Sequence, residues 1–290
     1  MRYAFISVFR NEWPISIQCR ALEVSVSGFW AWLKRPVSDR KIQDALIAEH
    51  ILASHQATNG VYGEPRIRAD LKAAGVKISH RRVARIMREL GIEGVSGRTR
   101  RRVQTTISDP RHPKASNILN RDFHADRPNQ SWVTDITAID TKEGTLYLAA
   151  IEDLFSRKVV GWAIDIHMET SLVTRALKSA IASRDVAPGL LHHSDRGCQY
   201  TSNDYQQLLA DYAMTPSMSR KGNCHDNACA ESFWARLKVE CLYRTIYPTH
   251  EAARDAVFRY IEVFYNRVRR HSALGYLSPD DFEAQYLETA

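Results

Sequence analysis

Residues 132–140 read WVTDITAID, and this short stretch decides the fold. Its β-branched and aromatic residues predict a strand, in which Val133, Ile136 and Ile139 are the apolar positions. Asp135 lies in the middle of that strand. An ionised carboxylate inside an apolar strand is costly unless it is paired or binds a metal. Asp135 is therefore the first candidate for a functional residue.

The residues that follow predict a mixed α/β sheet. Further strands are expected at 145–151, 158–166, 189–193 and 214–218. Helices are expected at 171–184, 203–212, 228–243 and 251–266. Three antiparallel strands followed by alternating helices and strands form an α/β sandwich, in an order that resembles the ribonuclease-H-like fold. We expect residues 128–290 to be one catalytic core with C-terminal helices.

Two further acids lie where this fold would bring them near Asp135. Asp195 follows the apolar strand expected at 189–193, and Gly197 permits a sharp exit from that strand. Glu231 lies near the start of the helix expected at 228–243, where a carboxylate also suits the helix dipole. Thirty-five residues separate Asp195 from Glu231. These three acids are expected to form one site.

An acid in a strand, a second at a strand end and a glutamate on a later helix resemble the pattern of integrase-type transposases. The sequence is similar to second-frame (OrfB-type) transposases of bacterial insertion sequences, whose catalytic core is like that of retroviral integrase. The phrases that carry the resemblance are WVTDIT at 132–137, HSDRGCQYT at 193–201, DNACAESFWARLK at 226–238, YNRVRRHSALGYLSP at 265–279 and YGEPRI at 62–67. The resemblance covers nearly the whole chain.

The resemblance implies a DNA transposase that uses two Mg²⁺ ions, for which Mn²⁺ is an expected substitute. Asp135 would contact both ions, Asp195 one of them and Glu231 the other. Two such ions stabilise the attacking and leaving oxygens of phosphoryl transfer, and hard cations take carboxylate oxygens as ligands. Water would release a 3′-hydroxyl at an element end, and that hydroxyl would attack a second phosphodiester. Lys238, two helical turns beyond Glu231, is expected to contact the DNA end.

The first 36 residues predict a small helix–turn–helix domain, with the pattern over 15–33. Ser25 or Ser27 is expected to cap its second helix. A plain helical hairpin without DNA contact is the alternative.

Residues 37–93 predict a second helix–turn–helix-like domain, with the pattern over 65–90. Ser79 is expected to cap a helix that has one apolar stripe. The basic residues expected to contact DNA from that helix are Arg81, Arg82 and Arg85. Solvated arginines on a plain hairpin are again the alternative.

A basic linker is expected at 94–127, because this segment has glycines and prolines and no sustained period. Arg100, Arg101 and Arg102 are expected to follow a phosphate backbone, although a disordered tether is the alternative. The first 127 residues hold 23 Lys and Arg against 12 Asp and Glu, whereas the remainder holds 17 against 21. A basic front half indicates a polyanionic partner, and an acidic back half is where carboxylate metal ligands are expected.

Other polar residues are given ordinary interpretations. Asp226 is expected to be an N-cap or first-turn acid, and Glu152 and Asp153 are expected to be turn residues. The residues that invite a zinc hypothesis are His192, His193, Cys198, Cys224, His225 and Cys229. They do not form two ligand pairs, and the two adjacent histidines alternate across a strand, so zinc is not expected.

The chain is expected to be a bacterial cytoplasmic protein without a membrane partner. Its five cysteines are irregularly spaced, which indicates a reducing compartment. No apolar run has the length that spans a bilayer, and no signal-peptide pattern follows Met1.

The expected partners are double-stranded DNA, as element ends and target, and further copies of the chain, because two DNA ends must be joined in one complex. In the family that the chain resembles, the active enzyme is often a frameshift fusion with an upstream helix–turn–helix and leucine-zipper segment, and this chain shows no long heptad repeat. A nuclease of the same fold that cuts RNA–DNA hybrids is disfavoured by the front domains. A catalytically silent regulator that binds DNA is disfavoured by the three acids.

Overall fold

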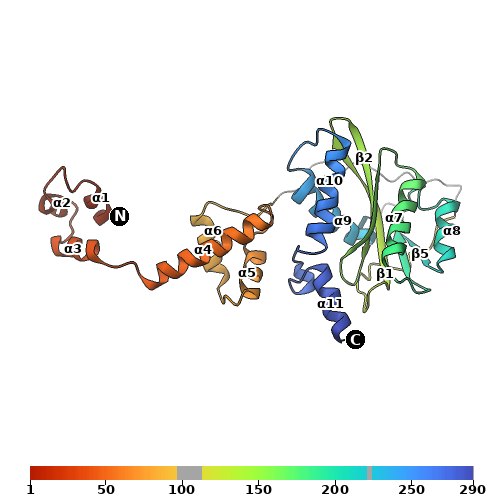
Figure 1. Cartoon of the computed structure of the whole chain (residues 1–290), viewed down its shortest axis with the longest axis horizontal. Helices are drawn as coiled ribbons and strands as arrows, with labels where there is room; N and C mark the ends of the chain where they lie inside the picture. Colours follow the sequence, from red (N-terminus) through yellow and green to blue (C-terminus); the bar gives the residue numbers. More distant parts are fainter. Residues whose placement is uncertain (97–112, 221–223, 290) are drawn as a thin grey trace.

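The protein is elongated and has three parts (Figure 1). The structure is a computed structural model that describes residues 1–96, 113–220 and 224–289. A small helical bundle lies at one end, a second helical domain follows it, and an α/β core forms the other end. Arg100, Arg101 and Arg102 lie outside the described residues. Within the described ranges, no helix has both the length and the apolar composition needed to cross a membrane.

A five-stranded mixed sheet forms the centre of the core, in the order β3-β2-β1-β4-β5. The strands are β1 (Ser131–Thr141), β2 (Gly144–Asp153), β3 (Val159–Asp165), β4 (Leu191–Ser194) and β5 (Thr215–Met218). The first three strands pair antiparallel, whereas β4 runs parallel to β1 and β5 runs parallel to β4. This topology confirms the fold expected from the order of strands and helices.

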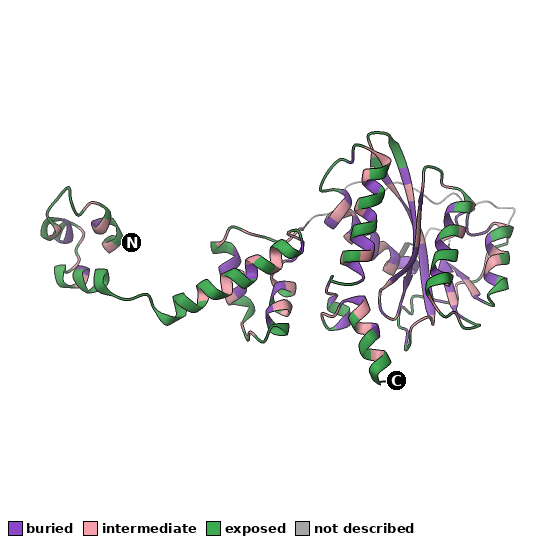
Figure 2. Ribbon diagram, viewed as in Figure 1, coloured by how far each residue is buried: buried purple, intermediate pink, exposed green. Residues whose placement is uncertain are grey.

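Helices cover both faces of the sheet (Figure 1). On one face lie α7 (Thr170–Ser183) and α8 (Asn203–Asp211), and on the other lie α9 (Ala228–Leu237) and α10 (His250–Phe258). Because side chains alternate along a strand, Trp132 of β1 packs with the α7 layer and Ile139 packs with the α9 layer. The strands are largely buried between the two helical layers, whereas each helix also has an exposed side (Figure 2).

The helices expected at 228–243 and 251–266 change their hydrogen-bonding pattern part of the way along. After α9, Lys238–Leu242 form the π-helical segment η2, and after α10, Arg259–Tyr265 form the π-helical segment η3. The extent of each helix is therefore as expected, but the last turns are wider than an α-helix. The chain ends with η4 (Ser272–Leu274) and α11 (Pro279–Thr289).

The N-terminal bundle contains α1 (Arg2–Val8), α2 (Ile15–Ala21) and α3 (Val26–Lys34) around Ile6, Cys19 and Phe29. Ser25 Oγ accepts a hydrogen bond from the Gly28 amide at 2.9 Å, so Ser25 and not Ser27 caps α3. The helix α1 was not expected from the sequence.

The second helical domain contains α4 (Asp39–Ala57), α5 (Glu64–Ala73) and α6 (His80–Glu89). Their shared core includes Ile51, Ile67 and Val83, one from each helix. Ser79 caps α6 as expected, since its side chain accepts from the Arg82 amide at 3.4 Å.

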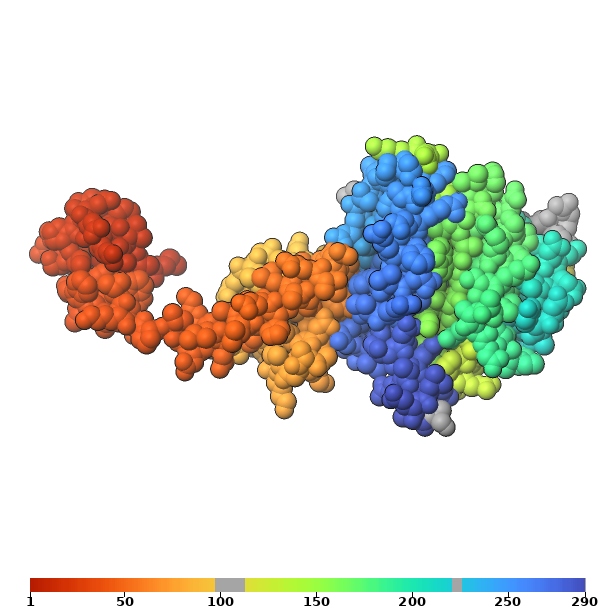
Figure 3. Space-filling model, in the orientation of Figure 1, coloured from red at the N-terminus to blue at the C-terminus, as the bar shows by residue number. Residues whose placement is uncertain are grey.

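This second domain packs against the C-terminal segment of the core, as the adjacent surfaces in Figure 3 show. Tyr62 Oη donates to the Val268 carbonyl oxygen at 2.8 Å and accepts from the Arg270 amide at 2.8 Å. The Arg270 guanidinium also pairs with the Asp70 carboxylate. Phe264 of η3 packs against the core of the second domain.

The end of the expected linker belongs to the core. Leu119 and Ala125 are buried against Val133, Leu154 and Ala230. The Ser217 hydroxyl accepts hydrogen bonds from the Ile118 and Leu119 amides, which attaches this segment to β5. The sequence predicted that the linker extends to residue 127. In the structure, the described part of that segment, from residue 113 onward, lies against the core.

Candidate active site

Asp135 lies on the face of β1 that is covered by α9, and its side chain is half-buried. Its Oδ1 accepts from the Ile136 amide at 2.8 Å. Its Oδ2 accepts from the Trp234 indole Nε1 of α9 at 3.1 Å. Each carboxylate oxygen therefore has one fixed donor, and the remaining acceptor capacity is available for another ligand.

The parallel pairing of β1 and β4 brings Asp195 near Asp135. The last paired residues are Val133 and His193; Asp135 lies two positions further along β1, and Asp195 follows Ser194, where β4 ends. Residues two apart in a strand share a face, so Asp135 lies on the α9 side with Val133. The negative charge of Asp195 raises the pKa of Asp135, which indicates that the two carboxylates are near one another. Asp195 Oδ1 accepts from the Gly197 amide at 2.9 Å, in the turn where the chain leaves β4. A Cβ at Gly197 would lie 2.9 Å from Gln199 Oε1 and 3.0 Å from Asp195 Oδ1, so the Asp195 carboxylate packs closely against this turn.

Glu231 lies on the stripe of α9 that contacts β1. Asn227 Nδ2 donates to the Thr134 carbonyl oxygen at 3.2 Å, and Trp234 donates to Asp135. Glu231 is one helical turn from each of these residues and shares their face. Lys238, one turn beyond Trp234 and half-buried, begins η2 on the same stripe. Its expected contact with a DNA end stays a prediction.

The three acids act on one another electrostatically. Burial raises the pKa of Asp135 to about 7, and the negative charge of Asp195 and then that of Glu231 also raise it. A divalent cation would relieve this repulsion, and three carboxylates are the hard oxygen donors that Mg²⁺ prefers. In the described part of the chain, no three His, Cys, Asp or Glu side chains are gathered into a ready metal site. The three acids suit a divalent cation because they offer oxygen donors and repel one another, although they do not form a complete coordination geometry in the described part of the chain.

Three supporting residues of this site were not identified from the sequence. No individual role for Trp234, Asn227 or Tyr200 was predicted from the sequence. Tyr200 is buried, and its Oη lies 3.3 Å from Thr134 Oγ1, next to Asp135. The spacing of Asn227, Glu231 and Trp234 by four and three residues is a signal that they share one helix face.

Asp226 is not the helix-capping acid that the sequence indicated. The N-cap residue of α9 is Asn227, and it makes no side-chain capping bond. Asp226 is instead buried in the short 3₁₀-helix η1 (Cys224–Asn227), where it pairs with Arg121 at 2.9 Å and Arg220 at 2.8 Å. Hydrogen bonding by Arg220 is the main cause that holds the pKa of Asp226 well below its usual value.

Glu152 and Asp153 are buried strand residues and not exposed turn residues. Asp153 Oδ2 accepts from the Asn129 amide at 2.7 Å and pairs with Arg184 at 3.3 Å. Glu152 lies 3.7 Å from Arg157, and burial raises its pKa to about 7. Both acids fix the end of β2, so their roles are structural.

His192 and His193 face opposite sides of β4, as the strand alternation indicated. His192 Nε2 lies 3.2 Å from Tyr205 Oη. His193 lies between the Ser217 and Ser219 hydroxyls, with its Nδ1 and Nε2 at 2.9 and 3.0 Å from them. Burial lowers the pKa of His192 to about 3 and that of His193 to about 4, so both are neutral near pH 7.

The arginines of α6 differ in their surroundings. Arg82 Nε and Arg85 Nη2 each lie 2.7 Å from one oxygen of Asp44 on α4. Arg81 is exposed. An ion pair within the domain competes with DNA for Arg82 and Arg85, and DNA contact by all three arginines stays a prediction.

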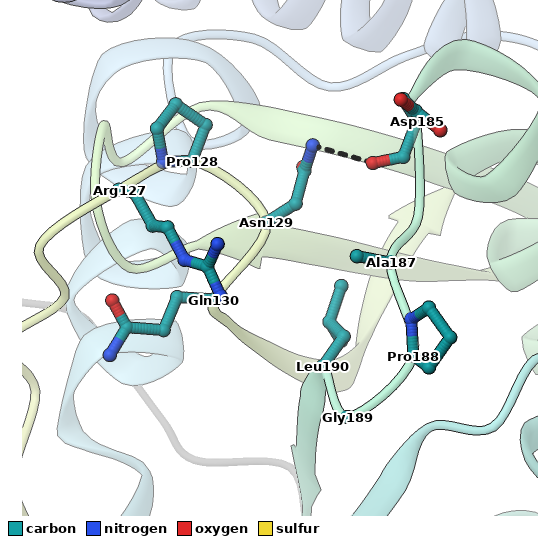
Figure 4. A pocket seen from close by; sticks show the side chains of 9 residues that line it. All are labelled: Arg127, Pro128, Asn129, Gln130, Asp185, Ala187, Pro188, Gly189 and Leu190. Atoms are coloured by element: carbon teal, nitrogen blue, oxygen red, sulfur yellow. Dashed lines mark hydrogen bonds between the residues drawn. The ribbon is translucent and has the colours of Figure 1, made fainter. Parts of the chain in front are cut away.

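A separate pocket of about 230 Å³ lies at the opposite end of the same strands (Figure 4). Its lining residues come from the segments 127–130 and 185–190, which precede β1 and β4. Asn129 Nδ2 donates across it to the Asp185 carbonyl oxygen at 3.1 Å. The pocket is therefore not part of the site that contains the three acids.

Comparisons with known proteins agree with this fold. The family described as Integrase core domain matches residues 125–224, and a second family of the same description matches residues 212–279. The HTH-like domain family matches residues 41–102. The molecule is thus of the integrase-core class, with a ribonuclease-H-like core preceded by a helix–turn–helix-like domain.

Curated relatives match along the whole chain. Transposase InsF for insertion sequence IS3A of Escherichia coli (strain K12) is 40% identical over 291 residues, which cover 99% of this chain and 100% of that protein. The uncharacterized 31 kDa protein of insertion element IS600 from Shigella sonnei is 40% identical over 272 residues, which cover 94% of this chain and 99% of that protein. The chain belongs to the family of insertion-sequence transposases that includes InsF.

Two solved structures align with this chain at low sequence identity. A simian T-cell lymphotropic virus intasome in complex with PP2A regulatory subunit B56 gamma aligns with a TM-score of 0.46 and 17% identity, over 80% of this chain and 74% of that chain. The HTLV-2 integrase catalytic core domain in complex with magnesium (dimeric form) aligns with a TM-score of 0.40 and 17% identity, over 55% of this chain and 99% of that chain. Family membership itself supports DNA transposition as the function and a polynucleotidyl transferase as the enzyme class.

Proposed function

We propose that this protein is a metal-dependent DNA transposase that cleaves the ends of its element and joins the free 3′-hydroxyl to another phosphodiester. The observation that carries the proposal is the electrostatic interaction of three acids. Asp135 lies on β1, Asp195 follows the end of the neighbouring strand β4, and both Asp195 and Glu231 raise the pKa of Asp135. Such a set is stable near neutral pH when a cation neutralises it.

In this proposal the three acids hold the metal ions, and Lys238 holds the DNA. Asp135 would contact two ions, with Asp195 on one and Glu231 on the other. Bound Mg²⁺ or Mn²⁺ would supply stabilisation of the attacking and leaving oxygens during in-line displacement. The donors from Trp234 and the Ile136 amide orient the Asp135 carboxylate for this role. Lys238, on the Glu231 stripe, would hold a phosphate of the DNA end.

The front domains would hold the element ends while the core acts on them. An HTH-like domain precedes the core, and Arg81 is exposed on its last helix. The full reaction joins two ends to one target, so we propose that the active form is an oligomer on DNA. An upstream-frame protein or fusion would supply additional end recognition.

Strand transfer by the purified protein with Mg²⁺ and an end-bearing DNA duplex tests the proposal. We expect joined products from the wild type and none from Asp195→Asn or Glu231→Gln, because each change removes one carboxylate from the site. Asp211→Asn is the matched control, since this acid is exposed at the end of α8. Joined products that persist in both site variants would contradict the proposed roles. DNA binding without any product from the wild type would favour the silent regulator.

A further inference from the structure

Two arginines from distant parts of the sequence meet on one buried carboxylate. The Asp226 side chain is fully buried, whereas 46% of the Arg121 side chain and 49% of the Arg220 side chain are exposed. The two guanidinium groups therefore cover the carboxylate and face solvent with their other sides.

One carboxylate cannot satisfy both cations. Asp226 Oδ1 accepts from Arg121 Nε and Arg220 Nη2, and its Oδ2 accepts from the Arg220 amide, Arg220 Nε and Asn117 Nδ2. These bonds use the acceptor capacity of the carboxylate, but an arginine has five N–H donors. Among the described side chains, Asp226 is the acceptor for Arg121, and it accepts from one of the five N–H groups of that arginine. Two guanidinium groups against one carboxylate leave this cluster with a net positive charge, and both arginine side chains are partly exposed.

The cluster lies at the same edge of the sheet as the candidate active site. Ser194 and Met218 are the last paired residues of β4 and β5, so Arg196 and Arg220 each lie two positions beyond that pair. Arg196 Nε donates to the Ser219 carbonyl oxygen at 2.7 Å, which joins the two strand ends. Asp195 directly precedes Arg196. Neighbouring strands are about 4.8 Å apart, so the chain at Arg220 leaves β5 next to the place where Asp195 and Arg196 leave β4.

The chain holds Arg121 in place through an uncommon backbone conformation. Asn120 and Arg121 have φ values of 42° and 65°, in the left-handed region that residues other than glycine rarely adopt. The Asn120 amide donates to Asn117 Oδ1 at 2.8 Å and closes this turn. An arginine whose side chain is fixed before binding loses less conformational entropy when it binds an anion.

We propose that Arg121 and Arg220, which are organised by Asp226, form together with Arg196 a phosphodiester-binding site that holds the DNA backbone beside Asp195. The planar guanidinium fork matches the oxygens of a phosphate, and several forks on neighbouring loops match consecutive phosphates. This inference rests on the proposed function, because the phosphates that reach this edge belong to the DNA being joined.

Binding of duplex DNA tests the site without any catalysis. Arg121→Gln, Arg196→Gln and Arg220→Gln are each compared with the wild type by fluorescence anisotropy at several salt concentrations, without divalent metal. We expect affinity to fall by about 3- to 10-fold in each variant and the slope of log K against log salt to fall by roughly 1. Arg175→Gln is the matched control, because 51% of the Arg175 side chain is exposed and it pairs with Asp165 on β3. Affinities and slopes equal to those of the control would overturn the site.

Chemical modification of the wild-type protein provides a second test that does not depend on the folding of a variant. Phenylglyoxal modifies accessible arginines, and mass spectrometry locates the modified residues. We expect duplex DNA to protect Arg121, Arg196 and Arg220 and to leave Arg175 as reactive as before. Equal modification of the three arginines with and without DNA would overturn the site.

The two proposals fail in different measurements. If the wild type forms no joined product but the three variants lose DNA affinity, the transposase proposal fails and the phosphodiester site stands. If the wild type forms joined product and the variants bind DNA as the Arg175 control does, the transposase proposal stands and the site is wrong.

Discussion

At the scale of single residues, the environment of a carboxylate decides whether it is structural or chemical. Asp226 is buried beneath two guanidinium groups, and its pKa lies well below the usual value because of the hydrogen bonds from Arg220. Asp135 has the opposite shift, since burial and two neighbouring acids raise its pKa to about 7. An acid whose charge is neutralised by its own fold is fixed in place, whereas one surrounded by like charge favours a cation.

Asp226→Asn is expected to destabilise the protein at pH 7, and the loss should shrink in acid. The unfolded-state pKa of an aspartate is about 3.9, and that of Asp226 in the folded state is lower. The carboxylate therefore stabilises the fold fully above about pH 5, and this contribution is lost as pH falls through the folded pKa. Urea unfolding of wild type and variant at pH 7 and at about pH 3, below the unfolded-state pKa, measures it. A difference that stays constant between the two pH values would contradict the assignment.

The sequence predicts the three acids as site residues from their places in expected strands and a helix and from the phrases of the resemblance, but it does not predict the residues that hold them. The donor to Asp135 is Trp234, 99 positions along the chain, and the partner of Asp226 is Arg121, 105 positions away. Such contacts depend on how α9 crosses β1 and how residues 113–122 return to the core. Local periodicity carries no information about either path.

At the scale of elements, a single glycine sets the approach of a helix to the sheet. Gly161 of β3 lies under α7, and a Cβ there would be 2.5 Å from the Ala176 carbonyl oxygen and 2.5 Å from the Ala180 amide nitrogen. Both atoms belong to the backbone of α7, so they cannot rotate away. The helix and the strand are in direct backbone contact because residue 161 has no side chain.

Gly161→Ala is therefore expected to lower the free energy of unfolding by about 1–3 kcal/mol, the usual cost of overpacking a core. Chemical denaturation followed by circular dichroism measures the change. Gly63→Ala is the control, because a Cβ there would meet Gly94 Cα at an ordinary 3.9 Å. Equal losses in the two variants would show that α7 moves to accommodate the methyl group.

Elements with a strong apolar period were predicted well, and those fixed by tertiary contacts were not. The strands β1 to β5 and the helices α7 to α10 begin within two residues of their expected starts. The helices α1 and α4 were missed, and each buries a single residue, Ile6 or Ile51. Residues 113–127 were taken for a linker because a segment without regular structure shows no period even where Leu119 and Ala125 are buried.

At the scale of the whole molecule, two phrases of unassigned role hold the second helical domain against the core. YGEPRI supplies Tyr62 and Arg66, and the segment after Tyr265 supplies Val268 and Arg270. Arg66 Nε donates to the Arg270 carbonyl oxygen at 3.0 Å, beside the two bonds of Tyr62. These bonds show that both phrases take part in a bracing contact between the two domains.

Tyr62→Phe removes both bonds of the hydroxyl and keeps the ring that packs with Phe264. The amide of Arg270 then lacks its acceptor, so we expect its hydrogen exchange to become about 5-fold faster, as the loss of one net hydrogen bond of about 1 kcal/mol implies. Amide hydrogen exchange read by mass spectrometry on peptides that cover 266–272 measures it. Tyr212→Phe, an exposed tyrosine after α8, should leave those peptides unchanged. Exchange of the Arg270 amide requires the two domains to separate locally. Unchanged exchange in Tyr62→Phe would therefore mean that the hydroxyl does not hold the interface. The Asp70–Arg270 pair and the apolar packing around Phe264 would then be sufficient.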